Sequence, residues 1–246
     1  MFKSFFSGTK PLGDFSFLSV DMHSHLLPGL DDGLQAIDQT ISFVQQLEDM
    51  GYRKLICTPH IFSEMYPNSP ETILPRLDLV RNEVAKAGID IEIEAAAEYM
   101  VDIEFEKLID SGKQLLTFGR KNYILIEMSY VAPSPNVEKI IFNLQMKGLT
   151  PILAHPERYN YFHNQLSKYE RLIELGCVLQ VNLLSFSGFY GKEVKKAGEL
   201  LFKNKMVSFL GTDMHHERHM LLLKELINQK DFASTVASAA LLNKTL

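Results

Sequence analysis

Histidines and carboxylates recur along this chain directly after short apolar runs. The recurring residues, in chain order, are Asp21, His23, His25, His60, Glu98, Glu127, His155, Asp213 and His215. Imidazole nitrogens and carboxylate oxygens without a thiolate suit divalent Mn, Fe, Zn or Co rather than Cu(I) or an iron–sulfur cluster. Any one of these residues alone is equally well explained as a packed core or surface residue. Their repetition at the same place after each apolar run predicts a hydrolase with more than one metal ion.

Several of these residues have local contexts that suit metal binding. His23 and His25 are two positions apart, so on an extended strand end both side chains point to the same side and can hold one ion. His60 follows a proline, which restricts the backbone before the imidazole. Glu98 and Glu127 follow apolar runs, where an unpaired buried carboxylate is costly and a nearby cation would compensate. An ion pair with a lysine or arginine would serve these two carboxylates equally well.

The Asp31-Asp32-Gly33 turn allows two interpretations. Asp beside Gly ahead of an amphipathic stretch is a common signal for a helix N-terminus, so the turn predicts a helix cap. Asp31 could cap the helix while Asp32 turns inward. Asp32 is therefore a further candidate metal ligand.

The two cysteines exclude one large class of phosphatase. Cysteine-dependent phosphatases need a Cys-x5-Arg loop, whose thiolate attacks phosphorus. Position six after Cys57 is Ser63, and position six after Cys177 is Leu183. Two cysteines are also too few for a disulfide framework and are consistent with a reducing compartment.

Length and composition indicate an ordinary globular domain: 246 residues, 46% hydrophobic and 22% charged. The net charge of -5 argues against nucleic acid as a partner, because a DNA-binding face should be basic. Residues 1–17 lack the apolar core of a signal peptide, and no apolar run approaches the roughly 20 residues of a membrane span. We therefore expect a cytoplasmic protein that does not insert into a membrane.

Short apolar runs alternate with segments of helical period, which predicts an α/β fold. Seven runs are expected to form buried strands: residues 17–20, 54–57, 89–93, 123–126, 151–154, 178–181 and 207–210. Six segments have helical period: residues 34–50, 69–87, 136–147, 166–175, 192–204 and 217–228. Pro75 indicates that the regular part of segment 69–87 starts late. Near-continuous apolar strands between helices are typical of a parallel sheet with helices outside it.

This alternation predicts one domain over residues 17–246, preceded by an N-terminal extension of residues 1–16. The sequence has no obvious linker, internal repeat or glycine-rich phosphate loop, which favours a closed or nearly closed barrel over an open doubly wound sheet. In such a barrel the carboxyl ends of all strands meet at one mouth. The candidate ligands follow those ends, so we expect them to meet there.

Four motifs together resemble one family. They are Asp-x-His-x-His-x-Leu-Pro-x-x-Asp-Asp-Gly at residues 21–33, Thr-Pro-His at 58–60, Leu-Ala-His-Pro-Glu-Arg-Tyr at 153–159 and Gly-Thr-Asp-x-His at 211–215. In combination they resemble the bacterial capsule-type protein-tyrosine phosphatases of the polymerase-and-histidinol-phosphatase (PHP) superfamily. The resemblance runs from about residue 20 to the C-terminal helices and carries nothing over to the residues before Phe17.

The resemblance implies a fold, a metal complement and a set of site residues. The fold would be a distorted seven-stranded (β/α)7 TIM-like barrel of the PHP type, with three divalent ions, usually manganese, at its mouth. The implied ligands are His23, His25, Glu98 and Asp213 for one ion, Asp32, His60 and His215 for the second, and Glu98, Glu127 and His155 for the third. Arg158 matches the family's phosphate-binding arginine, and Asp213 and His215 are expected to join it in catalysis.

The activity implied is hydrolysis of phosphotyrosine on a protein, with a bacterial tyrosine kinase that controls capsular or exopolysaccharide synthesis as the expected partner. A hydroxide activated by the ions would attack phosphorus while Arg158 holds the phosphoryl oxygens. A phenolate leaves with a pKa of about 10, which favours phosphotyrosine-like esters. Three alternatives stay open: a small-molecule phosphomonoesterase of the histidinol-phosphatase kind, a metal-dependent deoxyribonuclease, and a binding module with structural metal.

Aromatic residues cluster near the candidate ligands and could line a slot for a phenyl ring. They are Tyr130, Tyr159, Tyr161, Phe162, Phe186, Phe189 and Tyr190. Aromatics at loop bases more often pack in the core, so the slot is a hypothesis. His163, His216 and His219 are expected at the rim or on the surface.

Overall fold

The computed structural model describes residues 10–237 and 239–246, in which short strands alternate with helices. The strands are β1 (Val20–Asp21), β2 (Lys54–Cys57), β3 (His60–Ile61), β4 (Glu92–Ala95), β5 (Glu98–Met100), β6 (Tyr123–Glu127), β7 (Thr150–Ala154), β8 (Val178–Asn182) and β9 (Val207–Gly211). The α-helices are α1 (Ile37–Asp49), α2 (Pro70–Ala87), α3 (Ile103–Asp110), α4 (Val137–Met146), α5 (Leu166–Glu174), α6 (Lys192–Lys203), α7 (Glu217–Leu226) and α8 (Lys230–Val236). Short 3-10 helices are η1 (Pro156–Arg158), η2 (Asn160–Phe162), η3 (Leu183–Ser187) and η4 (Asn243–Thr245). In this part of the chain we find no helix with the length and apolar character that a membrane span requires.

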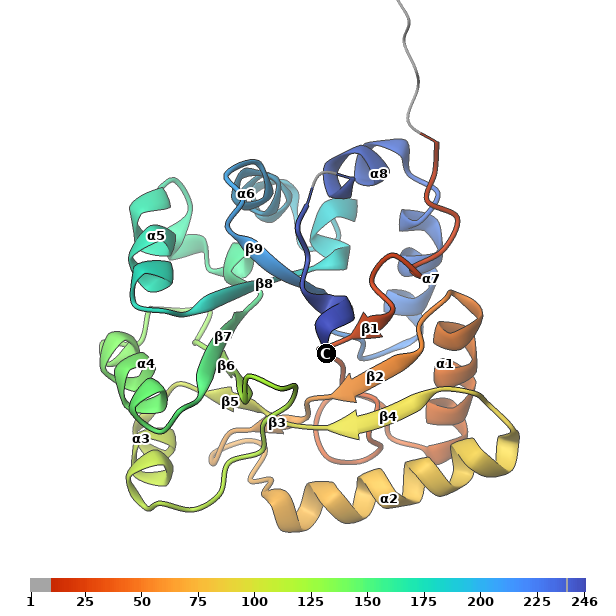
Figure 1. The fold of residues 1–246 in the computed structure, drawn as a ribbon, viewed down its shortest axis with the longest axis horizontal. Helices are drawn as coiled ribbons and strands as arrows, with labels where there is room; N and C mark the ends of the chain where they lie inside the picture. Colours follow the sequence, from red (N-terminus) through yellow and green to blue (C-terminus); the bar gives the residue numbers. More distant parts are fainter. Residues whose placement is uncertain (1–9, 238) are drawn as a thin grey trace, which may run out of the picture.

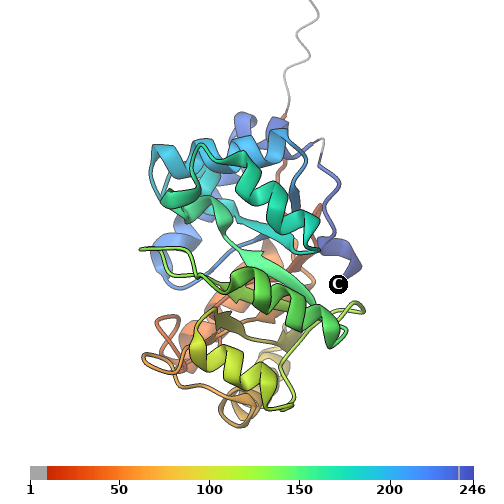
Figure 2. The same cartoon turned by 90° about the vertical axis from the view of Figure 1, so that its left-hand side faces the viewer.

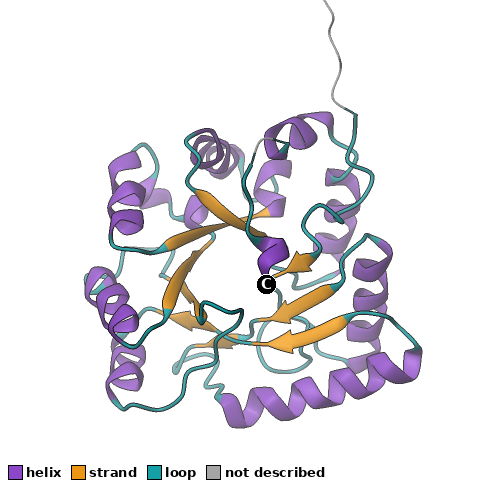
Figure 3. Ribbon diagram, in the orientation of Figure 1, coloured by secondary structure: helices purple, strands orange, loops and turns teal. Residues whose placement is uncertain are grey.

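The strands form two parallel sheets, ordered β1-β2-β4 and β3-β5-β6-β7-β8-β9. Figures 1 and 3 show the strands arranged around a common centre, with the helices outside them. The predicted α/β architecture of parallel strands covered by helices is therefore confirmed. The predicted seven-stranded barrel, closed or nearly closed, is not confirmed, because the described residues form two sheets and no closed sheet.

Two short gaps account for the division into two sheets. The gap between β2 and β3 is the Thr58-Pro59 pair, and the gap between β4 and β5 is residues 96–97. Proline has no N–H group, so it cannot donate to a neighbouring strand at this point. The two neighbouring segments nevertheless stay in contact at the gaps, because Glu98 N donates a hydrogen bond to Pro59 O at 3.1 Å.

The first and last strands are joined by a buried side chain instead of a full ladder. The segments that follow β1 and β9 share one parallel bridge, between Ser24 and Met214. Asn243 in η4, which lies near the centre of the ring of strands in Figure 1, is buried between the two strands. Its Nδ2 donates to Val20 O at 2.9 Å and to Leu210 O at 2.7 Å, and its Oδ1 accepts from Leu210 N at 3.1 Å.

Replacing Asn243 with alanine is expected to lower the free energy of unfolding by about 1–3 kcal/mol, because it leaves buried backbone groups without partners. Chemical denaturation of the metal-free protein would measure this change. Asn204→Ala is the matched control, because Asn204 is exposed and, within residues 10–237 and 239–246, its side-chain amide bonds only to Leu200 O. An equal decrease in the free energy of unfolding of the two variants would contradict the role of Asn243 in connecting β1 to β9.

Helix positions follow the apolar spacing of the sequence. In α4, the residues Val137, Ile140, Ile141 and Leu144 are buried, whereas Phe142 is exposed. Spacings of three and four residues place the buried set on one face of the helix. This face packs on the strands and leaves the opposite face to solvent.

One predicted element boundary is wrong for a clear reason. Helix α2 begins at Pro70 and contains Pro75, so the regular helix does not start late. A capping box between Ser69 and Thr72 satisfies the first backbone groups, and Pro70 at the first helical position needs no N–H partner, so the helix starts there and Pro75 lies inside it. The strands β3 and β5 and the helices α3 and α8 lie where no element was predicted.

The predicted N-terminal extension is described only in part. Residues 1–9 lie outside the described residues. Phe15, also assigned to the extension, is fully buried and stacks on Tyr52 with ring centroids 5.5 Å apart. Its backbone N–H donates to Met50 O at 2.7 Å. The packed part of the chain therefore begins before residue 17.

Candidate metal centre

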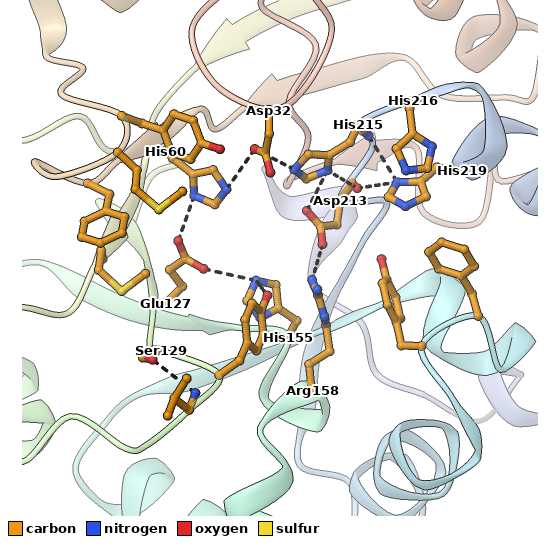
Figure 4. A pocket seen from close by; sticks show the side chains of 18 residues that line it. Asp32, His60, Glu127, Ser129, His155, Arg158, Asp213, His215, His216 and His219 are labelled. Carbon is orange, nitrogen blue, oxygen red and sulfur yellow. Dashed lines mark hydrogen bonds and ion pairs between the residues drawn. The ribbon is translucent and has the colours of Figure 1, made fainter.

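The expected ligands lie together at the carboxyl ends of the strands. Figure 2 shows the loops at these ends on the side of the molecule away from the C-terminus. Their positions are His23 and His25 after β1, Asp32 in the loop before α1, His60 in β3, Glu98 in β5, Glu127 at the end of β6, His155 after β7, and Asp213 and His215 after β9. Figure 4 shows six of these side chains around one pocket, together with Arg158. The fold thus brings residues from most of the strands to a single mouth.

The Glu98 carboxylate lies within the ligand group and is fully buried. Its Oε2 lies 3.1 Å from His23 Nε2 and 3.3 Å from His60 Nδ1. Its Oε1 lies 3.0 Å from His155 Nε2. The nearby Glu127 Oε1 lies 2.8 Å from His60 Nδ1. A carboxylate that faces imidazoles with both oxygens has the arrangement needed to bridge two cations.

Asp213 presents its two carboxylate oxygens to different neighbours. Oδ1 lies 3.4 Å from the Nε2 atoms of both His23 and His25. Oδ2 accepts hydrogen bonds from Arg158 at 2.9 Å and from Asn182 Nδ2 at 2.7 Å. The φ of Asp213 is 50°, in the left-handed region that residues with a side chain seldom adopt. Such strain is typical of functional positions, where the surrounding structure holds it in place.

Four groups of side chains each offer one nitrogen or oxygen within 4.8 Å of the others: His25, Asp32, His60 and His215; His23, His155 and Asp213; His23, His25 and Glu98; and His60, Glu98 and Glu127. The first group contains the three ligands expected for the second ion. The last group corresponds to the third ion, but it contains His60 in the place of the His155 that the resemblance implies. His155 nevertheless also contacts Glu98. Several side chains belong to more than one group, so neighbouring ions would share donors.

The donor set fits divalent cations. The Nε2 atoms of His23 and His25 lie 3.3 Å apart and face the same carboxylates. Within the described residues, no lysine or arginine lies within ion-pair distance of Glu98 or Glu127. An ion pair with such a residue was the alternative explanation for these buried carboxylates, and the described structure does not support it. In the metal-free protein the facing imidazoles compensate this charge when they are protonated, and a bound metal ion would take over that role.

Two buried side chains orient the first imidazoles. Asp31 Oδ2 lies 2.7 Å from His25 Nδ1 and also accepts a hydrogen bond from His60 N at 3.0 Å. Gln180 Oε1 lies 2.9 Å from His23 Nδ1. Because Nδ1 of each ring contacts one of these oxygens, Nε2 is left to face the other candidate ligands.

The predicted helix cap at Asp31 is wrong. Helix α1 begins further along the chain and has no side-chain cap. Asp31 Oδ1 instead accepts from Gly33 N at 3.0 Å, which closes a turn in front of His25. Gly33 is required there, because a Cβ would lie 2.2 Å from His25 O. The turn places the Asp32 carboxylate 3.5 Å from His215 Nε2, in agreement with the predicted inward direction.

The buried carboxylates change the protonation of two imidazoles. Burial disfavours the charged form of His23, but Glu98 and Asp213 outweigh this effect and raise its pKa to about 9. Burial opposes the charged form of His25 too, and the Asp31 carboxylate leads the interactions that raise its pKa well above the usual value. In the metal-free protein the carboxylates therefore favour the protonated, cationic form of both rings.

Metal binding at pH 7 is expected to release about two protons, one each from His23 and His25, because an imidazole must be neutral to bind a cation. Since the pKa of His23 is raised to about 9, protons compete with metal throughout the range below that pH, and metal affinity should fall as the pH is lowered. Titration calorimetry in buffers of different ionisation enthalpy would count the protons. The control variant His163→Gln, which lies outside the ligand groups, should release the same number of protons. Metal binding without proton release would contradict the expectation.

Arg158 lies beside the ligands and lines a cavity of about 600 Å³ (Figure 4). Its guanidinium carbon lies 4.6 Å from the ring centroid of Tyr130 and 4.4 Å from that of Tyr190. One of its nitrogens donates to Asp213. Among the described residues its other N–H groups have no hydrogen-bond partner. A guanidinium held between two aromatic faces can present those groups to an anion.

The aromatic residues considered for a phenyl slot divide into two groups. Tyr130, Phe189 and Tyr190 line the cavity, whereas Tyr159, Tyr161, Phe162 and Phe186 belong to the core or pack against it. The cavity is also lined by residues that gave no sequence signal: Phe62, Met65, Tyr66, Met100 and Val131. His219 was expected at the rim or on the surface; it is not on the surface but is buried and, like His216, lines the cavity.

Asp21 does not join the ligand groups, although its position after an apolar run suggested that role. Its carboxylate accepts hydrogen bonds from Thr212 N at 2.9 Å and from Thr212 Oγ1 at 2.6 Å. Burial raises its pKa to about 6. Asp21 therefore connects β1 to the segment that follows β9 through these hydrogen bonds.

Sequence reasoning missed two amides on β8. Gln180 contacts His23, and Asn182 donates to Asp213. Gln180 Nε2 also donates to Asn182 Oδ1 at 2.8 Å, so the two amides form one network. The available signal was a pair of amides at alternating positions in an apolar strand, which point to the same side.

The family described as "Capsular polysaccharide synthesis, CpsB/CapC" matches residues 19–225. The tyrosine-protein phosphatase YwqE of Bacillus subtilis is 29% identical over 197 residues, which cover 80% of this chain and 77% of that protein. The tyrosine-protein phosphatase CpsB of Streptococcus agalactiae is 29% identical over 203 residues, which cover 80% of this chain and 83% of that protein.

Solved structures agree with this match. One from a study of YwqE from Bacillus subtilis and CpsB from Streptococcus pneumoniae, described there as metal-dependent tyrosine phosphatases, superposes with a TM-score of 0.77 at 26% identity and covers 92% of this chain and 94% of that chain. An amidohydrolase from Mycoplasma synoviae, with a TM-score of 0.54 at 11% identity and coverage of 97% and 90%, shares the fold alone. Since the family match spans most of its length, this chain belongs to the CpsB/CapC family of capsular polysaccharide synthesis proteins.

Proposed function

We propose that this protein is a metal-dependent phosphomonoesterase that removes phosphate from protein phosphotyrosine. The observation that carries the proposal is a group of buried imidazoles and carboxylates beside Arg158, in a cavity lined by aromatic side chains. The names of its relatives in Bacillus subtilis and Streptococcus agalactiae support phosphotyrosine as the substrate.

We further propose three divalent ions, most simply manganese, held by the nine side chains His23, His25, Asp32, His60, Glu98, Glu127, His155, Asp213 and His215. Nitrogen and oxygen donors without sulfur support Mn, Fe, Zn or Co in general terms. Bound there, the ions would supply a nucleophile from water and neutralise negative charge on the phosphoryl group. His215 is suited to a ligand role, because its Nδ1 is engaged by Asp213 O at 2.8 Å and its Nε2 faces Asp32.

The side chains of this protein would bind and orient the ester. Arg158 would hold phosphoryl oxygens with the N–H groups that do not contact Asp213. Asp213 keeps the guanidinium turned toward the ligand group, and the ring faces of Tyr130 and Tyr190 exclude water from it. The apolar cavity wall would receive the phenyl ring of the substrate.

For the architecture, we propose that β2 with β3 and β4 with β5 each form one interrupted strand. Counted this way, the strands make a distorted seven-stranded barrel of the PHP type. It lies in one domain over residues 17–246, and Phe15 of the proposed extension, residues 1–16, packs against this domain. The contact between Glu98 and Pro59 across one gap and the Asn243 bonds between β1 and β9 support this interpretation.

The proposed partner is a bacterial tyrosine kinase that controls capsular or exopolysaccharide synthesis. The family description, capsular polysaccharide synthesis, supports this choice. We propose the cytoplasm as the place of action, which is compatible with the two buried free thiols of Cys57 and Cys177.

The test is turnover of three substrates by the metal-loaded protein: a phosphotyrosine peptide, the same peptide with phosphoserine, and histidinol phosphate. The proposal predicts the highest kcat/KM for the phosphotyrosine peptide, because a phenolate is a better leaving group than an alkoxide and the cavity wall is aromatic. Preference for histidinol phosphate would identify a small-molecule phosphatase instead. Nucleotide release from DNA at a comparable rate would favour a nuclease.

A further inference from the structure

We propose that Tyr190 is a further substrate-contacting residue, whose hydroxyl donates a hydrogen bond to a phosphoryl oxygen held by Arg158. This inference rests on the proposed phosphatase function and adds a residue to it. Tyr190 follows η3 and precedes α6, so it enters the site from a segment that carries none of the proposed ligands.

The Tyr190 hydroxyl is an unexplained polar group at the site. Its oxygen is buried and has no hydrogen-bond partner among the described residues. A buried hydroxyl without a partner costs free energy, so native structures seldom retain one without a reason. Tyr190 lines the same cavity as Arg158, and its ring lies 4.4 Å from the guanidinium carbon. An anion bound by Arg158 would give the hydroxyl its missing partner.

Neighbouring side chains leave this hydroxyl available as a donor. Asn182 lies nearby, and one of its two amide N–H groups donates to Asp213 while its oxygen accepts from Gln180. Its second N–H can only donate to the Tyr190 oxygen, which leaves the Tyr190 proton free to donate. Burial, followed by the Asp213 charge, raises the pKa of Tyr190, so the hydroxyl keeps its proton at physiological pH. A protonated phenol can donate to the negatively charged oxygens of a phosphate.

The two aromatic rings that contact Arg158, those of Tyr130 and Tyr190, have different roles. The Tyr130 ring lies 4.6 Å from the guanidinium carbon, much as Tyr190 does. Its hydroxyl, however, lies 3.4 Å from His155 Nε2 and so has a partner within the ligand group. Tyr130 is therefore a positioning residue for Arg158 and His155. Of the two rings that contact Arg158, only Tyr190 has a hydroxyl without a hydrogen-bond partner among the described residues.

The variant Tyr190→Phe removes the hydroxyl and keeps the ring against Arg158. We expect it to weaken the binding of inorganic phosphate to the metal-loaded protein by roughly 10- to 100-fold, the range for a hydrogen bond to a charged group. The kcat/KM values for an aryl and an alkyl phosphate should fall by the same factor, because the contact is with the phosphoryl group.

The matched control is Tyr52→Phe. Tyr52 also has a buried hydroxyl without a partner among the described residues, but it stacks on Phe15 in the core and does not line the cavity. Phosphate binding and turnover should be unchanged in this variant. Thermal unfolding and metal content of both variants would show that fold and metal loading are intact.

Each outcome decides a separate point. Unchanged phosphate binding in Tyr190→Phe would overturn the proposed contact. A much larger loss with the alkyl ester than with the aryl ester would overturn it as well, since the hydroxyl would then act on the leaving oxygen. Weakened phosphate binding in a protein that does not hydrolyse phosphotyrosine would support the Tyr190 contact while refuting the proposed substrate.

Discussion

Replacing Glu98 with glutamine is expected to reduce phosphate-ester hydrolysis by roughly a thousandfold, the upper range for loss of one preorganised electrostatic contact in an active site. Glu98 is fully buried and lies within 3.3 Å of His23, His60 and His155. The neutral amide has one oxygen in place of two, so it could not offer an oxygen to each of two ions in the proposed arrangement. Metal analysis and turnover of a phosphotyrosine peptide, measured on the same sample, would test this expectation.

The control for this substitution is Glu104→Gln. Glu104 forms an exposed ion pair with Lys107 on α3, and surface pairs of this kind contribute little. The control should keep its full activity and metal content. A Glu98→Gln variant that retained both would refute the proposed bridging role, whereas loss of the fold would appear as a lowered unfolding temperature.

Replacing Arg158 with lysine is expected to lower kcat/KM for phosphate esters by about 100- to 1000-fold while leaving the metal content unchanged. The planar guanidinium fits between the rings of Tyr130 and Tyr190 and can donate to Asp213 and to an anion at the same time. An ammonium group has neither the flat shape nor the paired donors. Competitive inhibition by inorganic phosphate should weaken together with turnover.

Arg171→Lys is the matched control, because Arg171 forms a surface pair with Glu138. It should leave kinetics and phosphate inhibition unchanged. An Arg158→Lys variant with unaltered phosphate inhibition would remove the phosphate-binding role from Arg158. Loss of metal in that variant would instead show that Arg158 acts by holding Asp213 in place.

Together the two substitutions separate metal binding from substrate binding. Glu98→Gln should lose metal and activity together, whereas Arg158→Lys should lose activity with metal retained. The structure supports this separation. Among the described residues, the ion-pair partners of Glu98 are all imidazoles, whereas the side chain of Arg158 forms an ion pair with the ligand group only through Asp213.

Much of the fold could be predicted from the sequence because buried strands and helices have different apolar periods. The predicted strand 54–57 is observed as β2, and the strands predicted near residues 123, 151, 178 and 207 are observed within one residue of the predicted bounds. β3 and β5 were missed because two or three residues are too few to show a period. The strand predicted at 89–93 is observed at 92–95, because pairing with β2 overrides the local apolar run.

The site could be predicted in outline for a different reason. Parallel strands covered by helices bring their carboxyl ends to one mouth, so residues that follow those ends must come close together whatever their separation in the chain. The oxygens of Asp31 and Gln180 that orient His25 and His23 could not be predicted, since each contact depends on the direction of both side chains. The ligand assignment itself stays a prediction until metal is measured.

The sequence by itself determined which chemical groups are available and at which strand ends they lie, because residue type and apolar period are local properties. Only the tertiary structure decided which atoms face one another. His155 with a φ of 36° and Asp213 with a φ of 50° adopt backbone conformations that isolated residues of their type disfavour. Packing of distant segments holds them there, and it likewise sets Tyr130 and Tyr190 on the two faces of Arg158, which no local pattern encodes.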